Sequence, residues 1–208
     1  VEPLRELNVE AGNYSRRQIS GDFGGALDEE GKWSYRLTAL LRDSDTFVDH
    51  VPDDRTYIAP AITWQPSAAT SLTLLAEYQK DHTVYVYGLP AQGTVLPNVN
   101  GRIPRNRFTG EPGFDKFNME RYSIGYLFEH AFNSQLKLRN SARYFHADST
   151  YHSTDIWQLA PDQRWTADRG AMPRWDRSSA LISDTSLQYE AGSSRSEERR
   201  VGKECRSR

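Results

Sequence analysis

Two tyrosines near the start of a long, Gly- and Pro-rich segment are the residues best suited to hold a ligand. Tyr85 and Tyr87 lie in residues 82–104. A tyrosine offers a rigid aromatic face and a hydroxyl that donates or accepts a hydrogen bond, so a pair of tyrosines can grip a bulky polar molecule. Glycine and proline fix turns, and long loops of this kind are commonly functional. The same tyrosines also suit an interfacial aromatic ring, and the residues alone leave both interpretations open.

Other clusters of reactive residue types do not make a catalytic or metal-binding pattern. Residues 43–54 hold five aspartates, but they lack the glycine and the closing glutamate of a calcium-binding loop, so we expect a solvated acidic loop. His146 and His152 are spaced to share one face of a strand, without an evident third ligand. The sequence has no phosphate-binding glycine loop and no nucleophile elbow. We therefore expect no metal site and no enzyme activity.

The segments that must position these residues alternate between apolar and polar side chains. In residues 33–42, every second residue from Trp33 to Leu41 is apolar, and residues 71–80 and 122–132 repeat this pattern. A period of two is typical of a strand with two different faces. Weaker alternation extends the set to eight candidate strands, which adds residues 4–11, 17–23, 57–64, 136–147 and 179–189. Most are near the roughly 9–11 residues that a tilted strand needs to cross a bilayer.

The connections between these strands alternate in length. Three are short, at residues 24–32, 65–70 and 133–135, and three are long, at residues 44–54, 82–119 and about 149–176. Only the first connection, around residues 12–15, is short at the end where long loops are expected. Long loops at one end and short turns at the other are typical of an outer-membrane barrel.

Aromatic residues lie at both ends of the alternating segments. One set is next to the short turns, and a second set is next to the long loops: Trp33, Trp64 and Phe132, then Tyr78, Tyr122 and Tyr144. Two such rings around an aliphatic band are favoured at the two interfaces of a membrane. A soluble β-sandwich or barrel, whose alternation covers a protein core, remains the alternative at this stage.

Composition excludes some classes of protein, and the two ends of the chain suggest the limits of the domain. The 208 residues carry 26 Lys+Arg against 28 Asp+Glu, which argues against a nucleic-acid partner, and no apolar run is long enough for a membrane helix. The chain begins at Val1 without a signal peptide, so we expect it to start inside a longer protein. Residues 195–208, which hold the single cysteine, resemble a translated sequencing adapter. We therefore expect one barrel domain at 1–194 and a non-native tail at 195–208.

Several segments in order resemble the TonB-dependent siderophore receptors, and most closely their ferrichrome and ferric hydroxamate branch. They include IAPAITWQP at residues 58–66 and SLTLLAEYQKD at residues 71–81. Further matching segments are at residues 35–46, 89–98, 110–117 and 126–133. The resemblance covers about residues 2–190.

The resemblance implies the N-terminal portion of a transmembrane β-barrel of about 22 strands, with about eight antiparallel strands here. It implies a receptor in the bacterial outer membrane, in contact with lipid, that binds a ferric siderophore and imports it with energy passed through TonB. The N-terminal plug and the box that contacts TonB are expected before Val1 and are absent from this chain. Iron is expected inside its chelator, so no protein-bound cofactor is implied.

The resemblance also implies ligand contacts. Tyr87, which precedes Gly88-Leu89-Pro90, matches an aromatic contact of the hydroxamate branch, although the further aromatic often found between that glycine and leucine is missing. Tyr85 is included by proximity, and Trp157 and Tyr151 by their place in the following long loop. A receptor for cobalamin, copper chelates or oligosaccharides, or a soluble β-rich binding or structural module, are the remaining alternatives.

Overall fold

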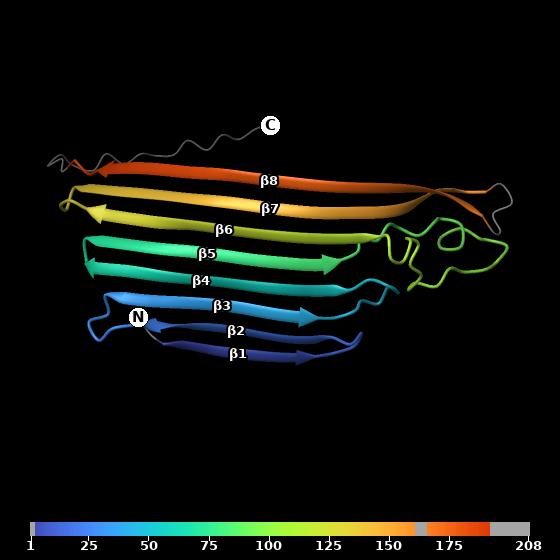
Figure 1. Cartoon of the computed structure of the whole chain (residues 1–208), viewed down its shortest axis with the longest axis horizontal. Helices are drawn as coiled ribbons and strands as arrows, with labels where there is room; N and C mark the ends of the chain where they lie inside the picture. Colours follow the sequence, from blue (N-terminus) through green and yellow to red (C-terminus); the bar gives the residue numbers. More distant parts are fainter. Residues whose placement is uncertain (1–2, 161–165, 192–208) are drawn as a thin grey trace, which may run out of the picture.

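The computed structural model describes residues 3–160 and 166–191, which form a single antiparallel sheet of eight strands (Figure 1). Each strand is hydrogen-bonded to the next one along the chain, and the bounds are β1 (Leu4–Ala11), β2 (Arg17–Ala26), β3 (Trp33–Asp43), β4 (Asp53–Ser67), β5 (Thr70–Thr83), β6 (Lys116–Ala131), β7 (Leu136–Leu159) and β8 (Ala167–Tyr189). The predicted all-β fold with eight antiparallel strands is confirmed. Within residues 3–160 and 166–191, we find no α-helix with the length and apolar character of a membrane span.

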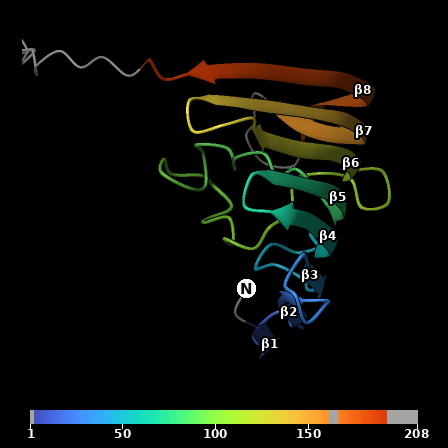
Figure 2. The same cartoon turned by 90° about the vertical axis from the view of Figure 1, so that its left-hand side faces the viewer.

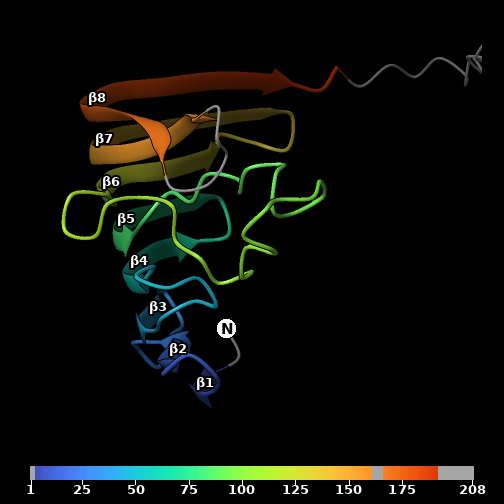
Figure 3. The same ribbon diagram turned by 90° about the vertical axis from the view of Figure 1, so that its right-hand side faces the viewer.

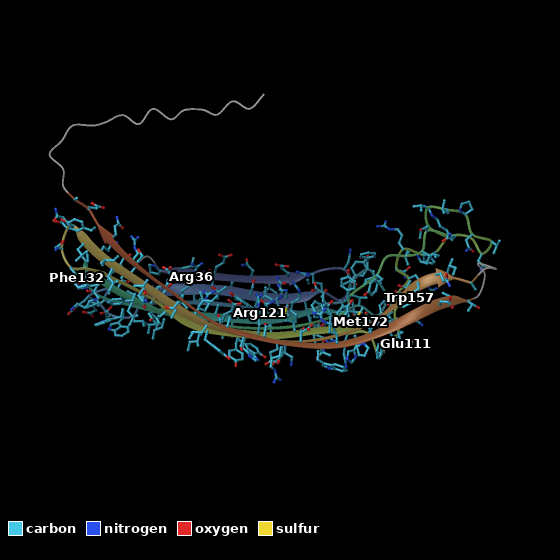
Figure 4. All side chains as sticks on the ribbon, turned by 90° about the horizontal axis from the view of Figure 1, so that it is seen from above. Arg36, Glu111, Arg121, Phe132, Trp157 and Met172 are labelled. Carbon is cyan, nitrogen blue, oxygen red and sulfur yellow. The ribbon has the colours of Figure 1, made fainter. Side chains whose placement is uncertain are left out.

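The sheet is a single curved layer with two chemically different faces. Figure 4 shows the strands bent in one direction, with Arg36 and Arg121 on the inner, concave side. The register fixes which residues share a face, because directly opposite residues point to the same side of the sheet. Leu37 lies opposite Pro60, Ile58 opposite Tyr78, and Tyr78 opposite Tyr122. The apolar members of the alternation therefore form one continuous convex face across the strands.

No protein layer covers this apolar face in the part of the chain that the structure describes. Ile124 is 62% exposed, Leu74 50% and Leu41 55%, all on the convex side. The buried hydrophobic residues among those described are Val48 and Val51, which lie in the loop between β3 and β4 and not in the sheet. A soluble module needs a core against which to bury such a face, and the described sheet has none.

The concave face is lined by charged and polar side chains that pair across neighbouring strands. Arg36 on β3 donates to Asp22 on β2 with an N–O distance of 2.7 Å. Arg55 on β4 donates to Asp81 on β5 at 2.6 Å, and Arg121 on β6 donates to the Gln79 side chain at 2.6 Å. Each of these pairs joins adjacent strands, β2 to β3, β4 to β5 and β5 to β6, on the face that Figure 4 shows as concave.

The strands are longer than the alternation predicts, and one expected loop is wrong. Residues 149–176 were expected as a long loop, but β7 continues to Leu159 and β8 begins at Ala167, so most of this range is a hairpin. In Figure 1 this hairpin extends further to the right than the other strands. The added residues are mixed in polarity on both faces, and strand pairing outside an apolar environment requires no alternation. Hydrophobic pattern therefore marks the apolar band of each strand and not its full length.

From β1 to β7 the connections follow the predicted order of short and long. The short turn after β6 is held by Asn133, whose side-chain oxygen accepts hydrogen bonds from the backbone N–H groups of Gln135 and Leu136, both at 2.9 Å. The long segment 84–115 joins β5 to β6, and Figures 2 and 3, which look along the strands, show most of it to one side of the sheet. The predicted domain boundary at 194/195 lies outside the described residues and stays a prediction.

Candidate functional site

Four aromatic side chains meet at the end of the sheet where the long loops emerge. The ring of Tyr85 lies 5.0 Å from that of Tyr87 and 5.8 Å from that of Tyr151, both edge-on. The ring of Phe117 lies 5.8 Å from Tyr151, again edge-on. Edge-to-face contacts at these centroid distances are the favoured geometry for aromatic pairs. We refer to Tyr85, Tyr87, Phe117 and Tyr151 as the aromatic cluster.

Strand register explains why residues so distant in sequence meet here. Thr83, the last residue of β5, lies opposite Phe117 on β6, and Phe117 lies opposite Tyr151 on β7. These three residues belong to the same face as Arg121, because their positions differ from it by even numbers on β6 and follow the pairing on β5 and β7. Tyr85 and Tyr87 continue the chain directly beyond β5. The aromatic cluster is therefore on the concave side.

A hydroxyl pair holds the aromatic cluster together. The hydroxyls of Tyr87 and Tyr151 share a hydrogen bond of 2.8 Å, and the Ser153 hydroxyl lies 3.4 Å from that of Tyr87. Ser153 has no exposed surface. Burial, reinforced by the bond to Tyr87, raises the pKa of the Tyr151 hydroxyl, while the bond to Ser153 acts in the opposite direction. Tyr151 therefore stays neutral at physiological pH and can donate or accept a hydrogen bond.

A buried carboxylate anchors the long loop beside the aromatic cluster. Asp115, the last residue before β6, accepts hydrogen bonds from the backbone N–H of Thr154 at 3.0 Å and from its hydroxyl at 2.7 Å. Both residues are buried. Gly110 makes this approach feasible, because a Cβ there would lie 2.1 Å from the nearer Asp115 carboxylate oxygen. The end of the loop is thereby fixed against β7.

A second set of bonds joins the two long loops to each other. The side-chain amide of Asn106 donates to both carboxylate oxygens of Asp49 at 3.0 Å, and the backbone N–H of Asp49 donates to the Asn106 carbonyl at 3.0 Å. The loop at 44–52 and the loop at 84–115 therefore form one connected wall. Because its ties run to β7 and to the neighbouring loop, this wall can hold the aromatic cluster in a fixed shape.

The structure brings three of the four predicted ligand residues together. Tyr85, Tyr87 and Tyr151 meet in the aromatic cluster, whereas Trp157 lies further along β7 at an irregularity between Ile156 and Gln158. Trp157 is 76% exposed, and its indole covers Gly170 so closely that a Cβ there would lie 2.5 Å from the ring nitrogen. Ligand contact by all four residues stays a prediction.

Sequence reasoning missed Phe117, Ser153 and Asp115 in this region. Phe117 lies near the start of β6, five residues before the predicted strand begins at Tyr122. Extending the polar half of that alternation backwards from Ser123 by even steps would have placed Phe117 on the concave face. Ser153 and Asp115 carry no comparable signal, because their burial depends on contacts between the loop and β7 that only the three-dimensional structure shows.

The two sets of predicted interface aromatics lie at opposite ends of the convex face. Trp33 is directly opposite Trp64, with ring centroids 6.0 Å apart. Tyr122 lies opposite Tyr78 and 6.2 Å from the ring of Tyr144. Phe132 follows the end of β6 and contacts His130 edge-on at 4.7 Å. Their placement agrees with two rings, and their contact with lipid stays a prediction.

The residues considered for metal binding have other partners. His146 pairs with Asp148 at 2.9 Å, and His152 packs between Phe114 and Trp175 with ring centroids 5.1 and 5.0 Å away. Among the described residues, no group of three or more His, Cys, Asp or Glu side chains is arranged to hold a metal ion.

The relatives that sequence comparison finds are named as receptors or transporters. The chain is 34% identical over 163 residues to the ferrichrome outer membrane transporter/phage receptor of Escherichia coli K12, which covers 78% of this chain and 22% of that protein. It is 29% identical over 183 residues to the ferrioxamine B receptor of Salmonella typhimurium SL1344, which covers 88% of this chain and 26% of that protein. The chain thus spans about a quarter or less of the length of these curated relatives. No family model matches the sequence.

Structural comparison supports the same fold. The closed form of the ferric-catecholate import receptor Fiu of Escherichia coli K12 superposes with a TM-score of 0.81 at 19% identity, over 92% of this chain and 29% of that one. At this identity the likeness concerns the fold: the eight-stranded sheet has the shape of one section of a receptor barrel. These relatives are receptors and transporters, and the sequence resemblance is confirmed.

Proposed function

We propose that this chain, a homologue of the TonB-dependent siderophore receptors, forms part of the barrel wall and of the extracellular vestibule of an outer-membrane receptor that binds and imports ferric siderophores. The observation that carries the proposal is the position of the aromatic cluster. It lies on the polar, concave side and at the long-loop end, beyond the apolar band. A ligand entering a barrel from outside meets that position first.

The convex face supports a place in a membrane. Ten residues separate Tyr122 from Phe132 along the chain. Ten residues of strand rise about 33 Å, and a strand tilted by about 40° then spans about 25 Å, the height of the apolar band of outer-membrane barrels. The two aromatic sets are thus spaced to lie at the two interfaces of a bacterial outer membrane. Apolar residues such as Ile124 then face lipid.

The chemistry of the aromatic cluster suits a hydroxamate chelate. Ring edges and faces pack against the carbon skeleton of a chelate, and the Tyr87 and Tyr151 hydroxyls offer hydrogen bonds to the carbonyl and N–O oxygens of its hydroxamate groups. Iron enters inside the chelate, so it is cargo and not a cofactor held by side chains of this protein. Energy for release would come from TonB through a plug, as in the relatives' family.

The test uses the intact receptor that contains this sequence, expressed in a bacterium without its own ferric hydroxamate receptors. Growth on ferrichrome or ferrioxamine B as the only iron source measures import. We expect growth with the wild type, and about tenfold weaker binding of the ferric chelate with Tyr87→Ala, because a packed aromatic ring and a hydrogen bond are lost. Tyr189→Ala, at the opposite end of β8, is the matched control and retains binding.

Two results would contradict the proposal. One is an intact receptor that reaches the outer membrane but imports no ferric siderophore. The other is import of cobalamin or an oligosaccharide in place of a ferric chelate, which would keep the barrel and change the cargo.

A further inference from the structure

A pocket lies between the long loop and the tips of β7 and β8, next to the aromatic cluster but outside it. Its volume is about 690 Å³, and its walls come from residues between Pro90 and Thr109 on one side and from Ile156, Leu159 and Ala167 on the other. Pockets that hold small molecules have volumes of about 300–1,000 Å³. The pocket is thus large enough for a substantial part of a chelate.

The loop is shaped to form this pocket. Gly93 has a φ of +89°, and a Cβ there would lie 2.8 Å from the Ile103 side chain. The backbone N–H of Ile103 donates to the Gly93 carbonyl at 2.7 Å, and the N–H of Gly93 donates to the Leu96 carbonyl at 2.8 Å. These bonds close residues 93–103 into a compact turn, and Ile103 lines the pocket from it.

Among the residues that the structure describes, the charged side chains of the pocket wall are both positive. They are Arg102 and Arg107, and none of the described lining residues is an aspartate or glutamate. Neither arginine forms an ion pair with any residue that the structure describes. Two acids of the described loop are engaged elsewhere, because Glu111 pairs with Arg169 at 3.1 Å and Asp115 is bound by Thr154.

Guanidinium groups bind anionic ligands in preference to neutral or cationic ones. They are always charged, and their planar donors match the two oxygens of a carboxylate. Two unpaired arginines at the rim of a partly apolar pocket therefore attract an anion and hold it in a defined orientation. Ile103 and Phe108, on the same wall, offer apolar contact to the carbon chain that carries the anion.

The pocket and the aromatic cluster share the segment that follows β5, because Pro90 in the pocket wall comes three residues after Tyr87. Three residues of strand span about 10 Å. A single chelate with a side arm of that length can contact both places.

We propose that the pocket is a second subsite of the receptor, which binds a carboxylate or similar anionic group on the siderophore through Arg102 and Arg107. The inference rests on the proposed function and narrows its substrate class. The preferred cargo is a ferric siderophore with an anionic arm, and the aromatic cluster holds the body of the chelate.

The test compares two probes that differ in one group. Ferrioxamine B carries a free amine, and its N-succinyl derivative carries a carboxylate in that position. Binding of both iron-loaded probes is measured on cells that display the intact receptor. We expect the succinyl derivative to bind the wild type about tenfold more tightly, and the Arg102→Gln, Arg107→Gln double variant to bind both equally within about twofold.

Two further variants separate charge recognition from damage to the loop. Arg105→Gln removes a charge from the same loop, but Arg105 does not line the pocket, so it keeps the preference. The Arg102→Glu, Arg107→Glu variant is expected to reverse it and favour the amine.

The outcomes distinguish the two proposals. Equal affinity of the wild type for both probes, with loss of binding in Tyr87→Ala, overturns the anionic subsite and leaves siderophore binding intact. Binding of neither probe by a correctly inserted wild type overturns both proposals.

Discussion

The hydroxyl of Tyr87 lies 2.8 Å from the hydroxyl of Tyr151, although 64 positions separate the two residues in the sequence. The bond joins the chain that leaves β5 to the middle of β7, which is two strands away in the sheet. Neither hydroxyl is placed by its own local sequence. Their meeting depends on the register of three strands and on the path of the long loop.

The hydroxyl pair should behave as one unit. We expect Tyr87→Phe and Tyr151→Phe each to weaken binding of a ferric hydroxamate by about threefold to tenfold, because each leaves the other hydroxyl without its partner, at a cost of about 1 kcal/mol. The double variant is expected to lose less than the product of the two effects. Dissociation constants of the four receptors measure this coupling, and strictly multiplicative losses would argue that the two hydroxyls act independently.

The Asp115 anchor should control access of proteases to the long loop. Asp115→Ala leaves the buried N–H and hydroxyl of Thr154 without an acceptor, which costs about 1–3 kcal/mol. We expect trypsin to cut the intact receptor several times faster at Arg102 and Arg105, in the loop that the anchor fixes. Limited proteolysis followed by mass spectrometry measures the rate.

The matched control for that experiment is Glu111→Gln, which alters an exposed acid of the same loop and its pair with Arg169. It should leave the rate of cleavage nearly unchanged. If Asp115→Ala is cut no faster than this control, the carboxylate does not hold the loop.

The two faces of the sheet should tolerate charge very differently. Ile124→Arg places a cation on the convex face two residues inside the interface at Tyr122, where burial in lipid costs less than the about 2–4 kcal/mol of the midplane but remains unfavourable. We expect reduced assembly of the intact barrel, seen as loss of heat-modifiable migration on a gel. Ser123→Arg adds the same side chain one residue away on the concave face, opposite Glu77, and should assemble normally. Equal assembly of both variants would contradict a lipid-facing convex surface.

Alkaline pH should weaken the aromatic cluster through Tyr151. Burial raises the pKa of its hydroxyl, so the folded protein holds this proton more tightly than the unfolded chain does. The resulting stabilisation is fully present below the ordinary tyrosine pKa of about 10 and is lost as pH rises through the folded value. Tyrosinate absorbance titrations of the intact receptor and of its Tyr151→Phe variant should differ by one tyrosine that ionises late.

The sequence predicted the sheet well because the two faces of these strands lie in different environments, so apolar and polar residues alternate along each strand. The range predicted for β1 agrees at both ends, and β3 is one residue longer than expected. The prediction failed for residues 149–176, where both faces of β7 and β8 are mixed in polarity and backbone pairing alone maintains the strands.

The candidate site was only partly predictable for a related reason. Tyr85 and Tyr87 stood out because tyrosine next to Gly and Pro signals a structured loop. The sequence of the loop does not show that the loop folds back to β7. That path depends on the hydrogen bond between Asp115 and Thr154, which are 39 positions apart in the sequence. Arg102 and Arg107 are ordinary surface cations in the sequence, and only the shape of the pocket gives them a shared role.

The continuation of β7 to Leu159 also determines the shape of the part of the proposed receptor that lies furthest from the membrane. From Tyr144 to Leu159 the strand runs for about 50 Å, paired with β8 along most of its course. In the proposed receptor, an antibody approaching the cell would therefore encounter a stiff ribbon with fixed spacing between side chains. Epitopes on that ribbon should be conformational, so sera raised against native cells should bind poorly to linear peptides from the same residues.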